Sequence, residues 1–275
     1  MPARCLVRGS INVDEFFQVK DIVRPGETIS STELVKRAGG KGANQAVALG
    51  RAGAIVDLVG ALQGAGVGVE GVSIAHENTG RAIIQVTELG ENSIILFKGA
   101  NYASIPPRPI HPDTTHIVLQ NEIPLESTID GEAFDLCSAL GLEMTNLNKP
   151  DPSVSARAAA KPLLSLLAAH LPTTNIVCTL GAHGVLANLT LLAATIHIPA
   201  AELQGSERDT TGAGDCFTGY MVAGLMSLEA KNATPTAADY VAVLRRATQA
   251  AGMCVEKAGA LASIPLGSEV DARLG

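Results

Sequence analysis

Hydrophobic positions along the chain alternate between short strand-like runs and longer helical patterns. Apolar or alternating runs predict strands at residues 4–9, 27–36, 55–62, 81–87, 93–97, 116–119, 175–180, 184–187 and 191–198. Helical spacing of apolar residues predicts helices at 45–52, 126–140, 153–170, 212–229 and 235–256. This order is typical of an α/β fold with a mainly parallel central sheet flanked by helices. No internal repeat or linker is visible, so we expect a single domain over residues 1–275, with a small β appendage.

Composition narrows the class of protein further. The 275 residues are 47% hydrophobic and 17% charged, with a formal net charge of −7. This is globular composition, and the absence of a basic patch argues against nucleic acid as a partner. The first ten residues lack the apolar core of a signal peptide, and the apolar stretch at 185–201 is interrupted by polar residues. We therefore expect no membrane association.

The cysteine pattern favours a reducing compartment and gives no sign of a metal site. Five cysteines are scattered without any C-x-x-C pair, and the six histidines show no metal-ligand spacing. Scattered thiols are typical of buried cysteines in a reducing environment. The expected location is the cytoplasm, or also the nucleus if the source is eukaryotic.

The most informative segment is DTTGAGD at residues 209–215, which leads into an apolar helix. The small residues Gly212, Ala213 and Gly214 leave backbone N–H groups unobstructed at a helix start, where an anion is favoured. Asp215 follows beside that anion position, where its carboxylate could accept a hydroxyl proton. The alternative is an ordinary capped helix, with Thr211 or Asp209 as the cap. This segment alone leaves both interpretations open.

A second segment, GGKGAN at residues 39–44, also precedes a helix. Consecutive glycines allow a ligand to approach the backbone, and Asn44 offers both a donor and an acceptor to a polyol. The segment is not a P-loop, because Val35 occupies the position of the first glycine and Gly42 follows the lysine. The alternative is a glycine-rich turn in which Lys41 is simply solvated.

Together these segments resemble the two signature sequences of the ribokinase family of sugar kinases. Other segments match in order: GSINVD at 9–14 resembles its first sugar-binding turn, and LQNEIPLE at 119–126 resembles a strand end with a sugar-contacting glutamate. TLGAHG at 179–184 is similar to its adenosine-side loop. Residues 258–260 with Ser263 resemble its C-terminal cation loop.

The resemblance implies transfer of the ATP γ-phosphate to the 5-hydroxyl of ribose, in preference to adenosine or fructose. Asp215 would be the catalytic base, and the amides of Gly212, Ala213 and Gly214 would form the anion hole. The implied ribose-binding residues are Asn12, Asp14, Gly39, Gly40, Lys41, Asn44, Glu122 and Asp215. The implied ATP-binding residues are Thr179, Gly181, Gly184, Gly212 and Asp215. Implied K⁺ positions are Asp209, Thr211, Gly259 and Ser263, and Glu132 is the implied Mg²⁺ residue.

The resemblance also implies a lid and an assembly. Lid strands would lie within about residues 13–38 and 81–100, and lids of this family often pair between subunits. A homodimer through the lid is therefore expected. Mg²⁺ would accompany ATP, and K⁺ would be an activating cation.

The chain departs from the family at two places. Residues 64–68 lead almost directly to residues 78–80, without the helix expected between them. After Glu126, a stretch of strand–helix units is missing, and Ile129 stands where an asparagine should precede Glu132. At least one interior strand is expected to be absent, which would leave neighbouring strands with unpaired backbone groups. We interpret the chain as a shortened member whose departures concern the Mg²⁺–ATP side.

Two other functions are compatible with parts of the sequence. The shortening favours an inactive remnant that binds sugar or nucleotide without turnover. The segment GVGVEG at 66–71 matches G-x-G-x-x-G after an apolar strand and favours a dinucleotide-dependent oxidoreductase, although the helix that follows is poor and short. Ribose-dependent ATP turnover would exclude the inactive remnant. Thermal stabilisation by ATP but not by NAD would exclude the oxidoreductase.

Overall fold

A computed structural model describes residues 3–58, 76–88, 91–103, 112–119, 171–192, 195–231 and 234–275, together with positions 123, 161, 164, 165, 168 and 169. The strands are β1 (Arg4–Arg8), β2 (Asn12–Gln18), β3 (Glu33–Gly39), β4 (Ile55–Leu58), β5 (Gly80–Val86), β6 (Asn92–Phe97), β7 (Thr114–Leu119), β8 (Ile176–Thr179), β9 (Val185–Asn188) and β10 (Ile196–Ile198). The α-helices are α1 (Lys41–Arg51), α5 (Ala213–Ala230), α6 (Ala237–Val255), α7 (Ala260–Ser263) and α8 (Gly267–Leu274). Two short 3₁₀ helices are described, η1 (Gly99–Tyr102) and η3 (Gly181–His183), and the described residues among 161–169 are helical.

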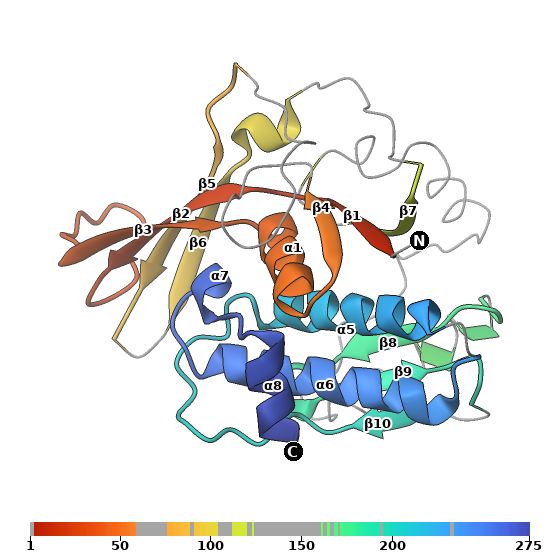
Figure 1. The fold of residues 1–275 in the computed structure, drawn as a ribbon. Helices are drawn as coiled ribbons and strands as arrows, with labels where there is room; N and C mark the ends of the chain where they lie inside the picture. The colour runs from red at the N-terminus through yellow and green to blue at the C-terminus, as the bar shows by residue number, and fades with distance from the viewer. Residues whose placement is uncertain are drawn as a thin grey trace.

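A parallel sheet forms the centre of the N-terminal part, as the strand–helix alternation predicts. β1 lies between β4 and β7 and is parallel to both, as Figure 1 shows. Its middle residues Cys5, Leu6 and Val7 are buried, since a parallel strand is covered on both faces. In open α/β sheets, ligands bind beyond the carboxyl ends of such strands, and β1 ends just before residues 9–14.

A separate four-stranded sheet has the order β3-β2-β5-β6 and projects to one side (Figure 1). β5 and β6 form the predicted antiparallel hairpin, and β2 pairs in parallel with β5. These four strands fall on the residues expected for the small β appendage. The buried Glu15 of β2 lies 3.0 Å from Lys36 Nζ and 4.0 Å from Arg81 Nη1. Its hydrogen bond with Lys36 lowers the pKa of Glu15, so this carboxylate stays charged.

The third sheet is antiparallel, in the order β10-β9-β8. It contains the predicted turn at residues 181–183, which the structure forms as η3. Among the described strands, β7 and β8 do not pair with each other. The missing strand–helix units that the sequence predicts after Glu126 fall in residues that the structure does not describe.

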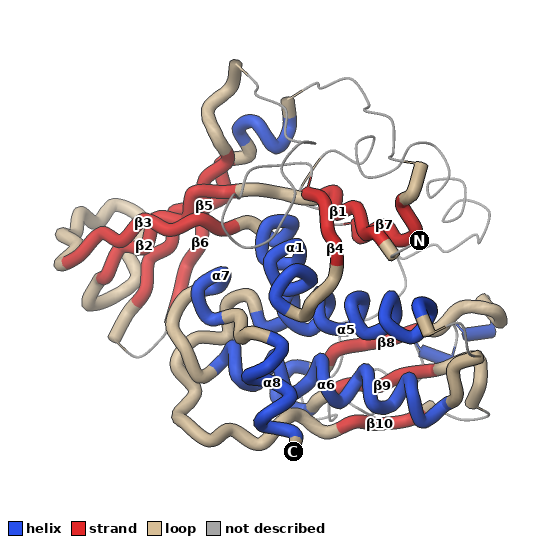
Figure 2. The backbone as a smooth tube through the Cα atoms, viewed as in Figure 1, coloured by secondary structure: helices blue, strands red, loops and turns tan. Residues whose placement is uncertain are grey.

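Three long helices pack beside one another and place the site-bearing segments together. α5 packs against both α1 and α6, as Figure 2 shows. Gly219 explains how closely α1 and α5 approach, because a Cβ at this position would lie 2.4 Å from Ala48 Cβ and 2.8 Å from the Gln45 carbonyl oxygen. Asp215, one turn before Gly219, therefore lies against the first turns of α1.

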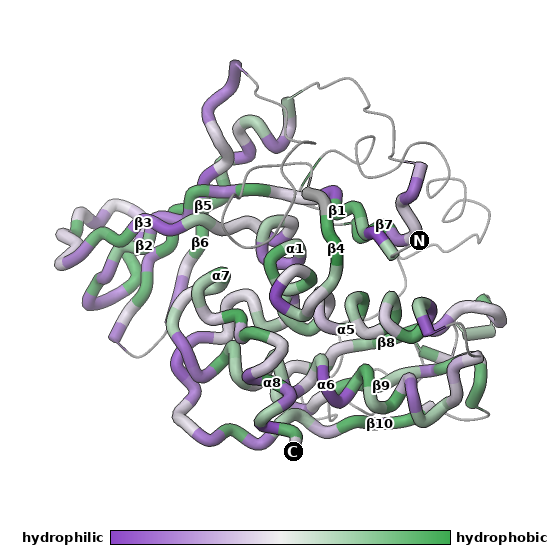
Figure 3. Tube along the Cα trace, viewed as in Figure 1, coloured by the Kyte–Doolittle hydropathy of each residue, from purple (hydrophilic) through white to green (hydrophobic). Residues whose placement is uncertain are grey.

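The core is built where these helices meet the parallel sheet. Its buried members include Val7 and Val47 together with Phe217 and Tyr220 of α5. Figure 3 shows the same trend, with hydrophobic colours along much of α5 and hydrophilic colours in the loop leading into it. Cys5, Cys216 and Cys254 are buried as expected, Cys178 is half-buried, and Cys137 lies outside the described residues.

Several predicted elements have different bounds in the structure. The strand expected at 27–36 covers Glu33–Gly39 instead, because residues 27–32 form a loop around Ser31 and Thr32 bonded to Gln18. The hydrophobic pattern does not predict β2, because its buried positions include the acidic Asp14 and Glu15, although the family resemblance places lid strands within about residues 13–38. Among the described residues of the run at 191–198, the strand covers Ile196–Ile198. Two helices that the pattern does not predict, α7 and α8, follow α6. The helix expected at 126–140 lies outside the described residues.

Within the part of the chain that the structure describes, no helix is both long and apolar enough to cross a membrane. The same residues contain no group of three or more His, Cys, Asp or Glu side chains arranged to hold a metal ion.

Candidate active site

The two glycine-containing turns expected to bind sugar interlock beyond the carboxyl end of β1. The Ser10 carbonyl oxygen accepts the Ala43 N–H at 3.1 Å, and Ser10 Oγ accepts the Lys41 N–H at 3.1 Å. Gly40 has a φ of 94°, and a side chain there would lie 2.6 Å from the Ser10 carbonyl oxygen. Only glycine permits this conformation without strain, so the first turn of α1 can lie directly on residues 9–14.

Polar side chains are buried at this junction. Asn12 and Asp14 on β2 are 7% and 6% exposed, and Asn44 on α1 is 4% exposed. Gly39 makes room for the Asp14 carboxylate, because an added Cβ would lie only 1.8 Å from Asp14 Oδ2. The Lys41 side chain, by contrast, is exposed. Buried amides and carboxylates at a sheet's ligand-binding edge are the groups that a polyol requires.

Asp215 lies in the first turn of α5 and receives two side-chain amides from α1. Asn44 Nδ2 donates to Asp215 Oδ2 at 3.0 Å, and Gln45 Nε2 donates to Asp215 Oδ1 at 3.0 Å. The opposite ends of these amides, Asn44 Oδ1 and Gln45 Oε1, are buried and have no protein partner among the described residues. Asp215 itself is half-buried, so its carboxylate is held in one orientation yet remains accessible.

Two of the three amides predicted for the anion hole are open at the start of α5. Gly212 is the N-cap residue, in the left-handed region at φ 81°, and no described side chain caps the helix. The Gly212 and Gly214 N–H groups have no acceptor among the described residues, and Gly214 is exposed. The Ala213 N–H instead donates to the Thr210 carbonyl oxygen over a long 3.3 Å. The capped-helix alternative is thus wrong for this helix start.

Asp209 has a structural role that differs from capping. Its Oδ1 accepts the Thr211 N–H at 2.9 Å, and its Oδ2 accepts the Gly259 N–H at 2.7 Å. The carboxylate therefore clamps the loop before α5 to the loop before α7. Ser263 Oγ donates to the Ala260 carbonyl oxygen at 2.7 Å and is fully buried beside Cys254.

The thiol next to Asp215 is not a reacting group. A hydrogen bond to Cys254, together with burial, raises the pKa of Cys216 well above its ordinary value. Cys216 therefore stays protonated at neutral pH, and the carboxylate of Asp215 is the neighbouring group that can accept a proton.

The remaining predicted residues are separate from this centre or lie outside the described residues. Thr179 and Gly181 lie at the exposed end of β8 and in η3, and Gly184 follows them at a φ of 84°. The structure shows this hairpin turn but no hydrogen bond from it to Asp215 among the described residues. Glu122, Ile129, Glu132 and the GVGVEG segment at 66–71 lie outside the described residues.

Three residues at the site were not expected from the sequence. Gln45 supplies the second amide to Asp215, Ser10 joins the two turns, and Asn101 Nδ2 donates to Asn12 Oδ1 at 2.7 Å. Gln45 follows Asn44 directly, so a signal existed in the segment itself. Asn101 lies 89 positions from Asn12 and has no such signal.

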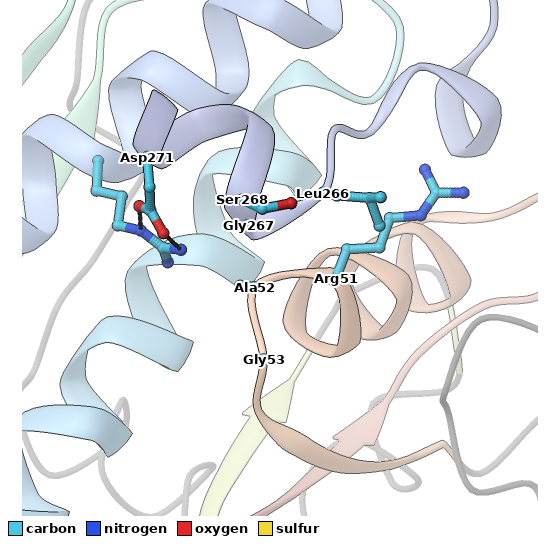
Figure 4. Close-up of a pocket in the computed structure, with 8 residues that line it drawn as sticks. Arg51, Ala52, Gly53, Leu266, Gly267, Ser268 and Asp271 are labelled. Atoms are coloured by element: carbon cyan, nitrogen blue, oxygen red, sulfur yellow. Dashed lines mark hydrogen bonds and ion pairs between the residues drawn. The ribbon is translucent and has the colours of Figure 1, made fainter. Parts of the chain in front are cut away.

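A cavity of about 360 Å³ lies elsewhere, between the end of α1 and the start of α8 (Figure 4). Its lining residues are Arg51, Ala52, Gly53, Arg246, Leu266, Gly267, Ser268 and Asp271. The charged side chains there already have protein partners. Arg246 forms an ion pair with Asp271, and Arg51 Nη1 donates to the Leu261 and Ile264 carbonyl oxygens. It is separated from Asn44 by most of the length of α1, and it includes none of the predicted site residues.

Comparison with known proteins identifies the family of this chain. The family described as pfkB family carbohydrate kinase matches residues 3–167 and 141–266. This chain belongs to the pfkB family of carbohydrate kinases. Membership makes it a phosphotransferase and disfavours the oxidoreductase interpretation of residues 66–71.

Relatives within the pfkB family match the chain nearly end to end. A ribokinase of Staphylococcus aureus (strain COL) is 30% identical, with 98% of this chain and 99% of the relative covered. That alignment runs over 319 residues, more than the 275 of this chain, which agrees with a shortened member. A ribokinase of Arabidopsis thaliana is 30% identical over 94% of this chain and 78% of its own length.

Solved structures agree with the fold. The ribokinase of Cryptococcus neoformans var. grubii serotype A, in complex with ADP, is 39% identical, covers 99% of both chains and has a TM-score of 0.81. The ribokinase of Arabidopsis thaliana complexed with ribose and ATP has a TM-score of 0.73 at 23% identity, with 99% of this chain and 98% of that chain covered. The fold expected from the sequence, α/β with a parallel sheet, flanking helices and a small β sheet, is confirmed.

Proposed function

We propose that this chain is an ATP-dependent sugar kinase that phosphorylates D-ribose at its 5-hydroxyl. The observation that supports this most is the placement of Asp215, held by Asn44 and Gln45, beside the uncapped amides of α5. The near-complete match to ribokinases of S. aureus and C. neoformans supports the same substrate.

The sugar side of the site is formed by Asn12, Asp14 and Asn44. Buried polar atoms without a partner are costly, and Asn44 Oδ1 is such an atom among the described residues. A sugar hydroxyl would satisfy it. A site of this kind rejects analogues that lack a hydroxyl, because its own polar groups then remain unpaired. Gly39, Gly40, Lys41 and Glu122 complete the proposed ribose-binding set.

Phosphoryl transfer depends mainly on positioning and electrostatics. In our proposal the amides of Gly212, Ala213 and Gly214 face the phosphoryl oxygens, where the positive end of α5 favours negative charge. Asp215 accepts the proton of the attacking hydroxyl. The two amides that donate to its carboxylate fix both oxygens, so the base is oriented before the substrate binds.

ATP and Mg²⁺ complete the proposed reaction. Thr179, Gly181 and Gly184 are the proposed adenosine-side residues, and Gly212 and Asp215 adjoin the phosphates. Mg²⁺ would bind with ATP and neutralise phosphate charge. Glu132 remains the proposed protein residue near this ion.

K⁺ is the proposed activating cation. Asp209 draws the loop before α5 and the loop around Gly259 together. The backbone carbonyl oxygens near Asp209 and Thr211, with the loop from Gly259 to Ser263, are the kind of donors that K⁺ prefers. Both oxygens of the Asp209 carboxylate already accept amides, so the fit rests on the carbonyls of the loops rather than on this side chain. Bound there, K⁺ would shape the neighbouring anion site.

A coupled assay of ADP release tests the function directly. The full chain with ATP, Mg²⁺ and K⁺ should release ADP only when ribose is added, and ³¹P NMR of the product should show a 5-phosphate. Deoxyribose variants of the substrate serve as controls for hydroxyl recognition. If a folded sample shows no ribose-dependent ADP release, the inactive-remnant alternative stands. A thermal-shift experiment should show stabilisation by ATP and none by NAD.

Assembly and location are further parts of the proposal. The edge strand β6 exposes Ile94, Ile95, Leu96 and Phe97 by 49–58% each, and the opposite edge strand β3 exposes Leu34. Exposed apolar side chains along both edges of the small sheet suit a homodimer in which two lids pair. Light scattering of the wild type and of Ile95→Glu should show a dimer that the substitution weakens. We also propose a cytoplasmic location, which imaging of a tagged chain would test.

A further inference from the structure

Asn101 lies where the small sheet meets the first sugar-binding turn. It belongs to η1, which directly follows β6 and is anchored by a 2.8 Å bond from the Ala100 N–H to the Asn78 carbonyl oxygen. Its side chain reaches residues 11 and 12, about ninety positions earlier in the chain. Asn101 is thus held by one segment and bonded to another.

The hydrogen bonds of Asn101 have a defined direction. The Ile11 backbone N–H donates to Asn101 Oδ1 at 2.9 Å. A backbone N–H can only donate, so Asn101 must turn its oxygen toward Ile11 and its Nδ2 toward Asn12. Asn101 Nδ2 then donates to Asn12 Oδ1 at 2.7 Å. The amide of Asn12 is therefore also fixed, with its oxygen toward Asn101.

The Nδ2 group of Asn12 is left for a ligand. It makes no hydrogen bond to the described residues, and it is not among their fully buried unpaired atoms. The space for this arrangement depends on Gly80, which pairs with Asn12 between β5 and β2. A Cβ at Gly80 would lie 2.2 Å from Asn101 Nδ2 and 2.5 Å from Asn12 Oδ1.

We propose that Asn101 is a positioning residue that fixes the amide of Asn12 so that Nδ2, and not Oδ1, faces the sugar. The inference rests on the proposed function and adds the polarity of one contact: a ribose hydroxyl oxygen accepts a hydrogen bond from Asn12. Asn101 does not touch the substrate. It acts by removing the freedom of Asn12 to present its oxygen instead.

Asn101→Asp is the sharpest test, because it is nearly isosteric and reverses the direction of the second bond. The aspartate keeps an acceptor for the Ile11 N–H but cannot donate to Asn12, so Asn12 turns its Nδ2 toward the carboxylate and its Oδ1 toward the sugar. The dissociation constant for ribose, measured by calorimetry, should rise about tenfold or more, while that for ATP stays within about twofold. Asn101→Ala, which leaves Asn12 free to adopt either orientation, should have a smaller effect on ribose.

A double-mutant cycle separates positioning from general damage. Once Asn12→Ala has removed the contact, adding Asn101→Asp should not weaken ribose further. Gly80→Ala, which disturbs the same bond from the opposite side, should reproduce the selective loss of ribose affinity. Melting temperatures of all variants identify any that fail to fold, and Asn101→Ala and Gly80→Ala then supply the test in place of Asn101→Asp.

The outcomes distinguish this inference from the proposed function. A wild type that binds no ribose overturns both. If the wild type binds ribose but the Asn101 variants have unchanged ribose affinity, only the role of Asn101 is overturned. The same holds if the effects of Asn12→Ala and Asn101→Asp on ribose affinity multiply in the double mutant.

Discussion

The side-chain amide of Asn44 donates to Asp215 Oδ2 at 3.0 Å, although the two residues lie 171 positions apart in the chain. One bond thus joins the first turn of α1 to the first turn of α5. Because Asn44 is proposed to bind the sugar and Asp215 to accept its proton, the same contact aligns substrate and base. Proton transfer requires such alignment before any adjustment of pKa is useful.

We predict that Asp215→Asn abolishes phosphoryl transfer and leaves ribose binding nearly unchanged. Loss of a general base lowers kcat by about 10²–10⁴-fold. The fold should tolerate the change, because Gln45 Oε1 has no described partner and can turn to accept the new amide. Steady-state kinetics and calorimetry with ribose provide the measurement. A variant that keeps most of its rate would show that Asp215 is not the base.

We predict that Asn44→Ala weakens ribose more than ATP. The substitution removes a buried donor and acceptor from the proposed sugar side, and the KM for ribose should rise about tenfold. The rate at saturating ribose should fall as well, since Asp215 loses one of its two described amide donors. The KM for ATP, measured on the same sample, is the internal control. Equal losses for both substrates would contradict a sugar-side role.

Gly219 offers a test of how helix packing supports the site. In Gly219→Ala, the added methyl would lie 2.4 Å from Ala48 Cβ, so α1 and α5 must separate. Overpacking of this kind costs about 1–3 kcal/mol of unfolding free energy. It should also lower kcat, because Asp215 moves away from Gln45. Urea unfolding and kinetics together measure both effects.

Gly205→Ala is the matched control for this experiment. The nearest atom to its added Cβ is 3.8 Å away, in ordinary van der Waals contact, and its φ is not in the left-handed region. Stability and rate should both stay at the wild-type level. If Gly219→Ala behaves like Gly205→Ala, close helix approach is not what positions Asp215.

Some of this site could be predicted from sequence, for physical reasons that differ between residues. Small residues before an apolar helix already indicate open amides, and the structure begins α5 at Ala213 after an uncapped Gly212. Local patterns report local geometry. The bonds from Gln45 to Asp215 and from Asn101 to Asn12 depend on tertiary packing, which no local pattern encodes. The hydrophobic pattern misses β2 because its buried positions hold carboxylates rather than apolar side chains.

The contact between α6 and α8 gives a prediction for pH dependence. Arg246 binds Asp271 with Nε at 2.6 Å from Oδ1 and Nη2 at 3.1 Å from Oδ2. The hydrogen bond to Arg246 lowers the pKa of Asp271 below its ordinary 3.8. A lowered pKa in the folded state means stability that is present above about pH 4 and is lost as the pH falls through the folded pKa.

Asp271→Asn should therefore lower the free energy of unfolding at pH 7 by at most about 1 kcal/mol, since this carboxylate is 59% exposed. The difference from wild type should shrink as the pH is lowered from 7 to below 3.8, through the folded pKa of Asp271. Urea unfolding at both pH values measures it. An equal loss at the two pH values would attribute the effect to packing in the cavity of Figure 4 rather than to the ion pair.

The last prediction concerns the cation. Asp209 bonds the N–H groups of both Thr211 and Gly259, so Asp209→Ala should let the two loops separate and raise the K⁺ concentration needed for half-maximal activity. Asp209→Asn keeps one acceptor and should have an intermediate effect. Potassium titrations at constant ionic strength, with Na⁺ as the replacement, give the measurement. A wild type indifferent to K⁺ rejects the cation itself, whereas an unchanged requirement in Asp209→Ala rejects only the clamp, because the loop carbonyls would then keep their places without it.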